Sequence, residues 1–175
     1  MRIRFSGLGG QGVVVSGVIY GHAGMLEGHN VLQRQSYGST TRGGVTTSDV
    51  TLAEGEIHEL EAPEFDALVA LCQEAHDRFR PLLRPGGVLL TERSLVDAQV
   101  DPGIRHFAVP AVERARDGLG RQILANIVIV GAVSAVLPDV GVESLRRAIT
   151  ANVPAGTADL NIRAFELGRD AVLEG

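Results

Sequence analysis

The chain has 175 residues, of which 45% are hydrophobic and 21% charged, and its formal net charge is −5. This length fits one domain spanning residues 1–175, which can bury roughly two-thirds of its unfolded surface. The acidic balance argues against nucleic-acid binding, which needs a basic footprint. All 16 basic residues are arginine, which excludes mechanisms that depend on a lysine Schiff base or a P-loop lysine.

The single cysteine, Cys72, excludes an intrachain disulfide and an iron–sulfur cluster held by this chain alone. The five histidines lack the short spacings of metal ligands. Because the first residues lack the apolar core of a signal peptide, we expect a reducing, cytoplasmic setting. The longest apolar stretch, residues 123–137, is interrupted by Asn126 and Ser134. It is too short for a membrane span, so we expect a buried helix and no membrane contact.

The first part of the chain predicts three strands and one helix. Residues 2–6 form a strand that ends in a glycine-rich turn, and residues 12–28 form a helix containing several glycines. Such glycines lower helix propensity, so we expect them to permit close packing against the sheet or a neighbouring chain. Further strands are predicted at residues 30–33 and 45–53, joined by a polar loop over residues 35–44.

The remaining residues alternate strands with helices. Strands are expected at residues 66–71, 88–91 and 104–109, and helices at residues 73–83, 120–137, 142–151 and 158–173. This order predicts a three-layer α/β/α sandwich with a Rossmann-like start. The sheet should be mostly parallel, with residues 45–53 as the candidate antiparallel strand that would make it mixed.

The first candidate binding segment lies between the first strand and the first helix and matches G-x-G-x-x-G. Its residues are Gly7, Gly9, Gly10, Gln11 and Gly12. Glycines let the backbone approach a ligand, and a helix N-terminus offers N–H groups to an anion. The segment therefore fits a nucleotide or CoA phosphate, or a partner's carboxylate. It equally fits a tight turn with nothing bound. A dinucleotide-binding domain should carry an acid near the end of the second strand, where this chain has Gln33 and Arg34.

The second candidate segment is the polar loop that follows the second strand. Its candidate residues are Ser36, Tyr37, Gly38, Arg42, Gly43 and Gly44. Hydroxyl groups and one guanidinium can bind a carboxylate or a phosphate, or the loop can dock on another subunit. Loops at the carboxyl ends of neighbouring strands converge on one crevice, so we expect the two segments to form one polar site.

These motifs resemble the gamma subunit of 2-oxoacid:ferredoxin oxidoreductases. The resemblance rests on G-x-G-G-Q-G-V at residues 7–13, S-Y-G at 36–38 and R-G-G at 42–44, and it continues through residues 63–71, 83–88, 126–135 and 161–168. One departure is Ser39-Thr40, where many members have Pro-Glu. The loop is more similar to the 2-oxoglutarate and branched-chain branches than to the pyruvate or indolepyruvate branches.

The resemblance implies a non-catalytic subunit of a complex that converts a 2-oxoacid to acyl-CoA and CO2. Thiamine diphosphate, Mg2+ and [4Fe-4S] clusters would be held by alpha and beta subunits, CoA would bind in the complex, and ferredoxin would accept the electrons. This chain would bind no cofactor alone, would be inactive in isolation and could self-associate when expressed alone. The alternative is a free-standing Rossmann-like protein that binds CoA or a nucleotide such as NADP or FAD.

Overall fold

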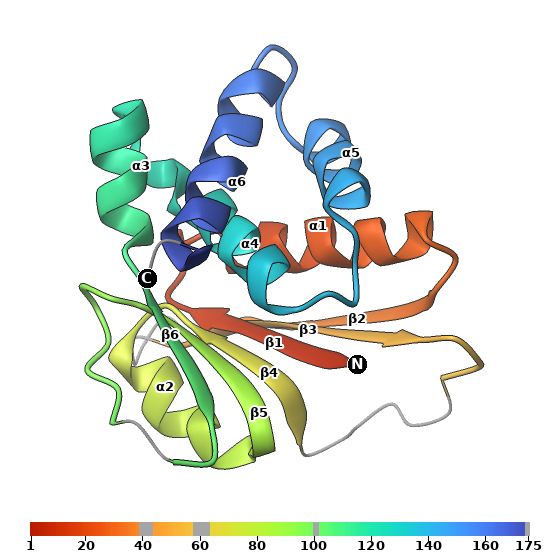
Figure 1. Cartoon of the computed structure of the whole chain (residues 1–175). Helices are drawn as coiled ribbons and strands as arrows, with labels where there is room; N and C mark the ends of the chain where they lie inside the picture. The colour runs from red at the N-terminus through yellow and green to blue at the C-terminus, as the bar shows by residue number, and fades with distance from the viewer. Residues whose placement is uncertain (39–43, 58–63, 100–101, 174–175) are drawn as a thin grey trace.

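The centre of the molecule is a six-stranded sheet. The computed structural model describes residues 1–38, 44–57, 64–99 and 102–173. The order across the sheet is β2-β3-β1-β4-β5-β6 (Figure 1). The strands are β1 (Arg2–Gly7), β2 (Asn30–Ser36), β3 (Thr46–Ala53), β4 (Phe65–Ala70), β5 (Leu83–Glu92) and β6 (Arg105–Val109).

The sheet is mixed, as the sequence predicts. β1, β4, β5 and β6 run parallel to one another, and β3 lies antiparallel between β1 and β2. Phe5 of β1 therefore has Ser48 of β3 on one side and Val69 of β4 on the other. β1 and β2 point the same way, so their carboxyl ends lie at the same end of the sheet.

Helices cover both faces of the sheet, which confirms the sandwich. One face carries α1 (Val13–Leu26), α3 (Ala111–Leu119), α4 (Ala125–Val136), α5 (Val142–Asn152) and α6 (Ala158–Leu173), whereas α2 (Gln73–Phe79) lies on the other (Figure 1). The main core packs Phe5 of β1 and Tyr20 of α1 against α4 and α6. A smaller core lies under α2. No helix in the described residues has the length and apolar character needed to cross a bilayer.

Three elements differ from the prediction. The predicted helix over residues 73–83 ends at Phe79 and passes through a 3-10 turn, Arg80–Leu82, directly into β5. β5 is longer than predicted because residues 84–87 are accommodated as a bulge, with Gly86 at φ 77°. α3 was not predicted, because its buried positions, Ala111 and Ala115, are small and surrounded by charge.

Candidate functional site

The candidate site lies where the chain reverses its direction across the sheet. From β1 the chain passes through α1 toward β2 and β3, whereas β4 lies on the opposite side of β1 and is followed by α2 on the other face. In α/β sheets, ligands bind outside the carboxyl ends of the strands at such a switch point. A cavity of about 320 Å³ opens here, lined by Gly10, Gln11, Leu71, Glu92, Leu95, Val112, Gln122, Ile123, Ala125, Asn126 and Ile129.

The glycine loop predicted from the sequence forms one wall of this cavity and is held by the side chain of Gln11. The Leu8 N–H donates to Gln11 Oε1 at 2.6 Å, and Gln11 Nε2 donates to the carbonyl oxygen of Leu71 at 2.9 Å. These bonds fasten the loop after β1 to the end of β4. Gly10 and Gly12 have φ of 87° and 71°, a conformation that favours glycine.

The first turn of α1 faces this loop without a side-chain cap. Its N-cap residue is Gly12, and no side chain of the described residues makes a capping hydrogen bond there. The Asn126 side chain packs against Gly12 so closely that a Cβ on Gly12 would lie 2.5 Å from Nδ2. Asn126 also lines the cavity. The loop therefore offers backbone N–H groups and one amide to whatever approaches.

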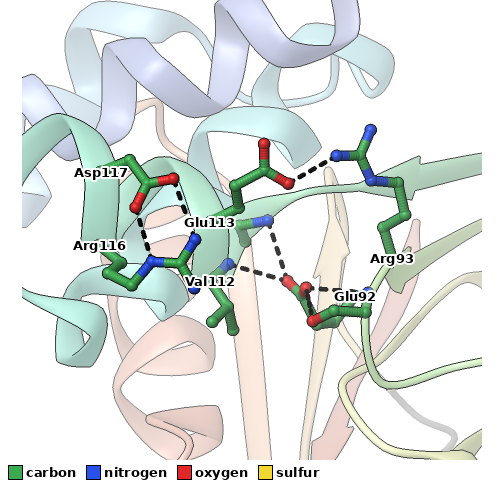
Figure 2. Close-up of polar contacts among 8 residues, drawn as sticks. Glu92, Arg93, Val112, Glu113, Arg116 and Asp117 are labelled. Atoms are coloured by element: carbon green, nitrogen blue, oxygen red, sulfur yellow. Dashed lines mark hydrogen bonds and ion pairs between the residues drawn. The ribbon is translucent and has the colours of Figure 1, made fainter.

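Glu92 at the end of β5 is a buried carboxylate with every bond supplied by its own chain. Its Oε2 accepts from the N–H groups of Ala111 and Val112 at 2.9 and 3.1 Å, and its Oε1 accepts from the N–H and Oγ of Ser94 at 3.2 and 2.8 Å (Figure 2). Pro110, the N-cap of α3, has no side-chain acceptor, so Glu92 caps that helix instead. A carboxylate engaged in this way serves the fold.

The charged pairs beside Glu92 are exposed. Arg93 lies 2.7 Å from Glu113, and both side chains are about half exposed (Figure 2). Arg116 donates to Asp117 at 2.6 Å, and this hydrogen bond lowers the pKa of the Asp117 carboxyl. Exposed pairs of this kind contribute little to stability. Of the three carboxylates Glu92, Glu113 and Asp117, Glu92 is therefore the one that stabilises the fold.

The mouth of the cavity is apolar. Leu95 after β5 and Ile123 before α4 line the cavity and are 46% and 79% exposed. Leu8 of the adjoining glycine loop is 40% exposed. Apolar side chains that gather around a cavity mark a contact with another molecule more often than isolated exposed ones do. Among the described residues, no cluster of three His, Cys, Asp or Glu side chains could hold a metal ion. The mouth is therefore suited to docking.

The second candidate segment begins at the same end of the sheet as the glycine loop. Ser36 pairs with Thr47 of β3, and Gly7 pairs with Thr46, so only β3 separates the two loops. Tyr37 is exposed, and its hydroxyl donates to Gln35 Oε1 at 2.8 Å.

The two ends of this segment lie close together. A Cβ on Gly38 would collide with the backbone of Gly44. Arg42 and Gly43 lie outside the described residues. The described parts of the two predicted segments thus share one end of the sheet, and Arg42 remains a sequence-based candidate.

Two other residues singled out by the sequence are packed inside the chain. Cys72, at the N-cap of α2, is buried, and burial raises the pKa of its thiol. A Cβ on Gly17 of α1 would collide with Ser48 of β3. The sequence left open whether the α1 glycines allow close packing against the sheet or against a neighbouring chain. For Gly17, the close neighbour is the sheet.

Glu92, Asn126, Leu95 and Ile123 were not predicted as site residues. They come from two segments, residues 92–95 and 123–126, that only the fold brings together. Of these residues, only Glu92 has a local sequence signal, because it is an acid directly after an apolar strand. That signal does not show that Glu92 binds the start of α3.

Comparison with known proteins places the whole chain in one family. Residues 2–171 match the family model described as pyruvate ferredoxin/flavodoxin oxidoreductase. The chain is 35% identical to 2-oxoglutarate synthase subunit KorC of Methanothermobacter thermautotrophicus, over 99% of this chain and 96% of that protein. It is 30% identical to ketoisovalerate oxidoreductase subunit VorA of Methanothermobacter marburgensis, over 97% of this chain and 36% of that protein.

A solved structure agrees with these relatives. The keto/oxoacid ferredoxin oxidoreductase gamma subunit from Geobacter sulfurreducens superposes with a TM-score of 0.88 at 37% identity, covering 99% of each chain. The fold and the sequence thus match along the same full length. The chain therefore belongs to the pyruvate ferredoxin/flavodoxin oxidoreductase family, as one of its gamma-type subunits.

Proposed function

We propose that this chain is the non-catalytic gamma subunit of a thiamine-diphosphate-dependent 2-oxoacid:ferredoxin oxidoreductase that acts on 2-oxoglutarate. The observation that carries the proposal is the end-to-end match with the KorC subunit, which leaves almost none of either chain unaligned. The VorA match is less identical and spans about a third of that protein, so a branched-chain 2-oxoacid is the second candidate. The complex would release CO2, form the acyl-CoA and pass electrons to ferredoxin.

The residues of this chain support an architectural role within that complex. A [4Fe-4S] cluster needs several cysteine ligands, and this chain has one cysteine. Glu92, the buried acid beside the cavity, already accepts four hydrogen bonds and is not placed to act as a base. We therefore assign the thiamine diphosphate, the Mg2+ and the clusters to the alpha and beta partners.

The contact with those partners is assigned to the switch-point face, which consists of the glycine loop (residues 7–12), residues 36–38 and 44, and the apolar residues Leu95 and Ile123 at the cavity. A Cβ on Gly9 would meet no atom of the described residues within 4 Å, so among them this glycine leaves open space in front of the loop. A partner carboxylate or the CoA pyrophosphate fits the uncapped start of α1 behind it. Arg42 would supply the cation of this contact.

Co-expression with alpha and beta subunits tests the assignment. We expect one stable complex on size exclusion, active with 2-oxoglutarate and CoA and weaker with 2-oxoisovalerate. The isolated chain, supplied with thiamine diphosphate, Mg2+ and CoA, should show no turnover. Folded subunits that always elute separately would refute the assignment, and a preference for 2-oxoisovalerate would select the second candidate.

The switch-point face is tested with a pair of matched glycines. Gly9→Leu places a side chain in front of the loop, and Gly55→Leu does the same at another open glycine, beyond the far end of β3. We expect Gly9→Leu to weaken assembly or CoA use and Gly55→Leu to leave both unchanged. Arg42→Ala should weaken the same property roughly ten- to hundredfold, the usual size of a charge-assisted contact. Equal effects of the two glycine variants would reject the face.

A further inference from the structure

β2 is an unprotected edge of the sheet. Within the described part of the chain, only β3 pairs with it, so its other side presents unpaired backbone groups. It has seven residues, no proline and one charged side chain, Arg34. Exposed edges are usually blunted by shortness, proline, several charges or a covering element. β6, the opposite edge, is shorter, and α6 packs near it.

α1 carries an apolar stripe along the same edge. At about 100° per residue, Val14, Val18 and Met25 fall within roughly 40° of one another around the helix. Ile19 and Ala23, on the opposite side, are fully buried in the core. Met25 is 63% exposed, and the two valines are half-buried. A helix that is apolar on all sides is typical of a buried helix, yet this chain leaves one side of α1 open.

We propose that a second copy of this chain docks on this surface, with β2 pairing antiparallel to β2 of the second copy about a two-fold axis at Gln33. The two six-stranded sheets would join into one. Leu32 would lie opposite Arg34 of the second copy, and Asn30 opposite Ser36. The proposal stands on the geometry of this edge and does not rest on the proposed function.

Charge favours a second copy in this register. Symmetric pairing about Gln33 keeps the two Arg34 side chains apart and sets each beside a leucine, which can pack on the aliphatic stem of the arginine. Like charges directly opposite each other would destabilise the pair, and this register has none. An isologous two-fold contact is also the commonest way in which identical chains associate.

The spacing of the helices favours the same axis. α1 lies over the groove between β2 and β3, because Gly17 abuts Ser48 and Gln33 while Gly24 abuts Leu52 and Val31 (Figure 1). Its axis is then about half a strand spacing inside β2. With strands about 4.8 Å apart, the two α1 helices would lie about 10 Å from each other, which is a packing distance for helices. One axis thus covers both the strand edge and the apolar stripe.

Disulfide trapping tests the register. Two full-length variants, N30C and S36C, are made in a Cys72→Ala background, mixed and oxidised. Paired positions on adjacent antiparallel strands meet the distance requirement of a disulfide. We expect a crosslinked dimer on a non-reducing gel from the mixture and none from either variant alone. Absence of the mixed dimer overturns the register. In the co-expressed complex, a crosslink from N30C to an alpha or beta subunit would overturn the proposal.

Two variants of opposite charge at Leu32 test the contact between the two copies. Leu32→Arg places an arginine opposite Arg34 of the second copy at two symmetric positions. Sedimentation velocity should then show that the dissociation constant of the dimer is raised about tenfold or more. Leu32→Glu sets a carboxylate there and should keep or tighten the dimer. Ala108→Arg, at an exposed position of β6, is the control and should change nothing. A monomeric native chain, or equal weakening by both Leu32 variants, would overturn the proposal without touching the family assignment.

Discussion

The glycine loop after β1 and the crossing of α4 with α6 both use glycine, and for opposite reasons. At the crossing, a Cβ on Gly131 would collide with the Phe165 carbonyl oxygen, and one on Gly168 would collide with that of Val128. Each helix therefore needs a glycine where the other passes. At Gly9 a Cβ would meet no atom within 4 Å in the part of the chain that the structure describes. The fold explains the first two glycines, whereas the described residues give no packing reason for Gly9, which we propose lies at a contact with a partner.

The polar contacts of the two regions show the same contrast. Arg169 of α6 donates to Ser134 Oγ of α4 at 3.0 Å, and its guanidinium lies 5.9 Å from the Phe165 ring centre. The crossing is thus closed by groups from both helices. In the glycine loop, Gln11 holds the backbone while Leu8 is exposed and α1 has no side-chain cap. We therefore expect substitutions at the crossing to affect folding and those on the loop to affect partners.

The largest effect is expected for Gly131→Ala. The added methyl group would push α4 away from α6, and overpacking of a tight contact costs about 3 kcal/mol at the upper end of its usual range. Alanine by itself favours a helix over glycine by about 1 kcal/mol, so propensity alone predicts the opposite sign. Urea unfolding of the isolated chain measures the difference. A more stable variant would show that the crossing is not close-packed.

Next in size is Glu92→Gln, at the base of the cavity. Glutamine has nearly the same shape, but its NH2 group must face N–H donors at Ser94 or at the start of α3, leaving them without an acceptor. We expect a loss of about 2 kcal/mol in unfolding free energy. Glu113→Gln, whose carboxylate forms the exposed pair with Arg93, should cost less than about 0.5 kcal/mol. Similar losses for the two variants would mean that Glu92 does not cap α3.

Gly9→Leu should change the stability of the isolated chain by less than about 0.5 kcal/mol, as for other exposed sites. Its effect should be confined to assembly or CoA use. Thermal unfolding of the isolated variant, read beside the co-expression result, checks both halves. If Gly9→Leu unfolds the chain, Gly9 belongs with Gly131 as a packing residue, and the contrast between the two regions disappears.

Most of the fold could be predicted because its signals are local. The strand over residues 2–6, the glycine turn and the apolar helix after it follow from neighbouring residues, and β1 and α1 confirm them. α6 has the predicted bounds because its apolar spacing is regular. α3 was missed because its helix signal rests on two small alanines between charged residues and on a cap, Glu92, that lies far away in the sequence.

The candidate site was predictable only in part. The G-x-G-x-x-G segment is continuous in sequence, so its place beside the start of α1 could be foreseen. The cavity also needs Leu71, Asn126 and Ile123, which lie far from that segment in the sequence and are brought beside it by the fold. The family resemblance at residues 126–135 and 161–168 falls on two helices, but the sequence alone does not explain why these residues are shared with the family. The structure supplies one, since Gly131 and Gly168 let these two helices cross.

The smallest expected effect is a pH dependence of the free energy of unfolding, which comes from a histidine between β5 and β6. His106 of β6 lies with Nε2 2.8 Å from Thr91 Oγ1 of β5. Burial, followed by the nearby His76, lowers the pKa of His106 below its ordinary value. In the unfolded chain a histidine titrates at about pH 6.5. The unfolded chain therefore binds a proton first as the pH falls, and the folded chain resists it.

The free energy of unfolding should consequently be constant above the unfolded pKa of His106 and should decline as the pH falls through its folded pKa. His106→Gln keeps a group that can bond Thr91 but removes the titration, so its stability should fall less between neutral and mildly acidic pH. Urea unfolding of both proteins at several pH values gives the comparison, and the other histidines cancel because both proteins contain them. If the free energies of unfolding of the native chain and of His106→Gln change in parallel with pH, protonation of His106 is not coupled to folding. The region between β5 and β6 is then more open to water than its packing indicates.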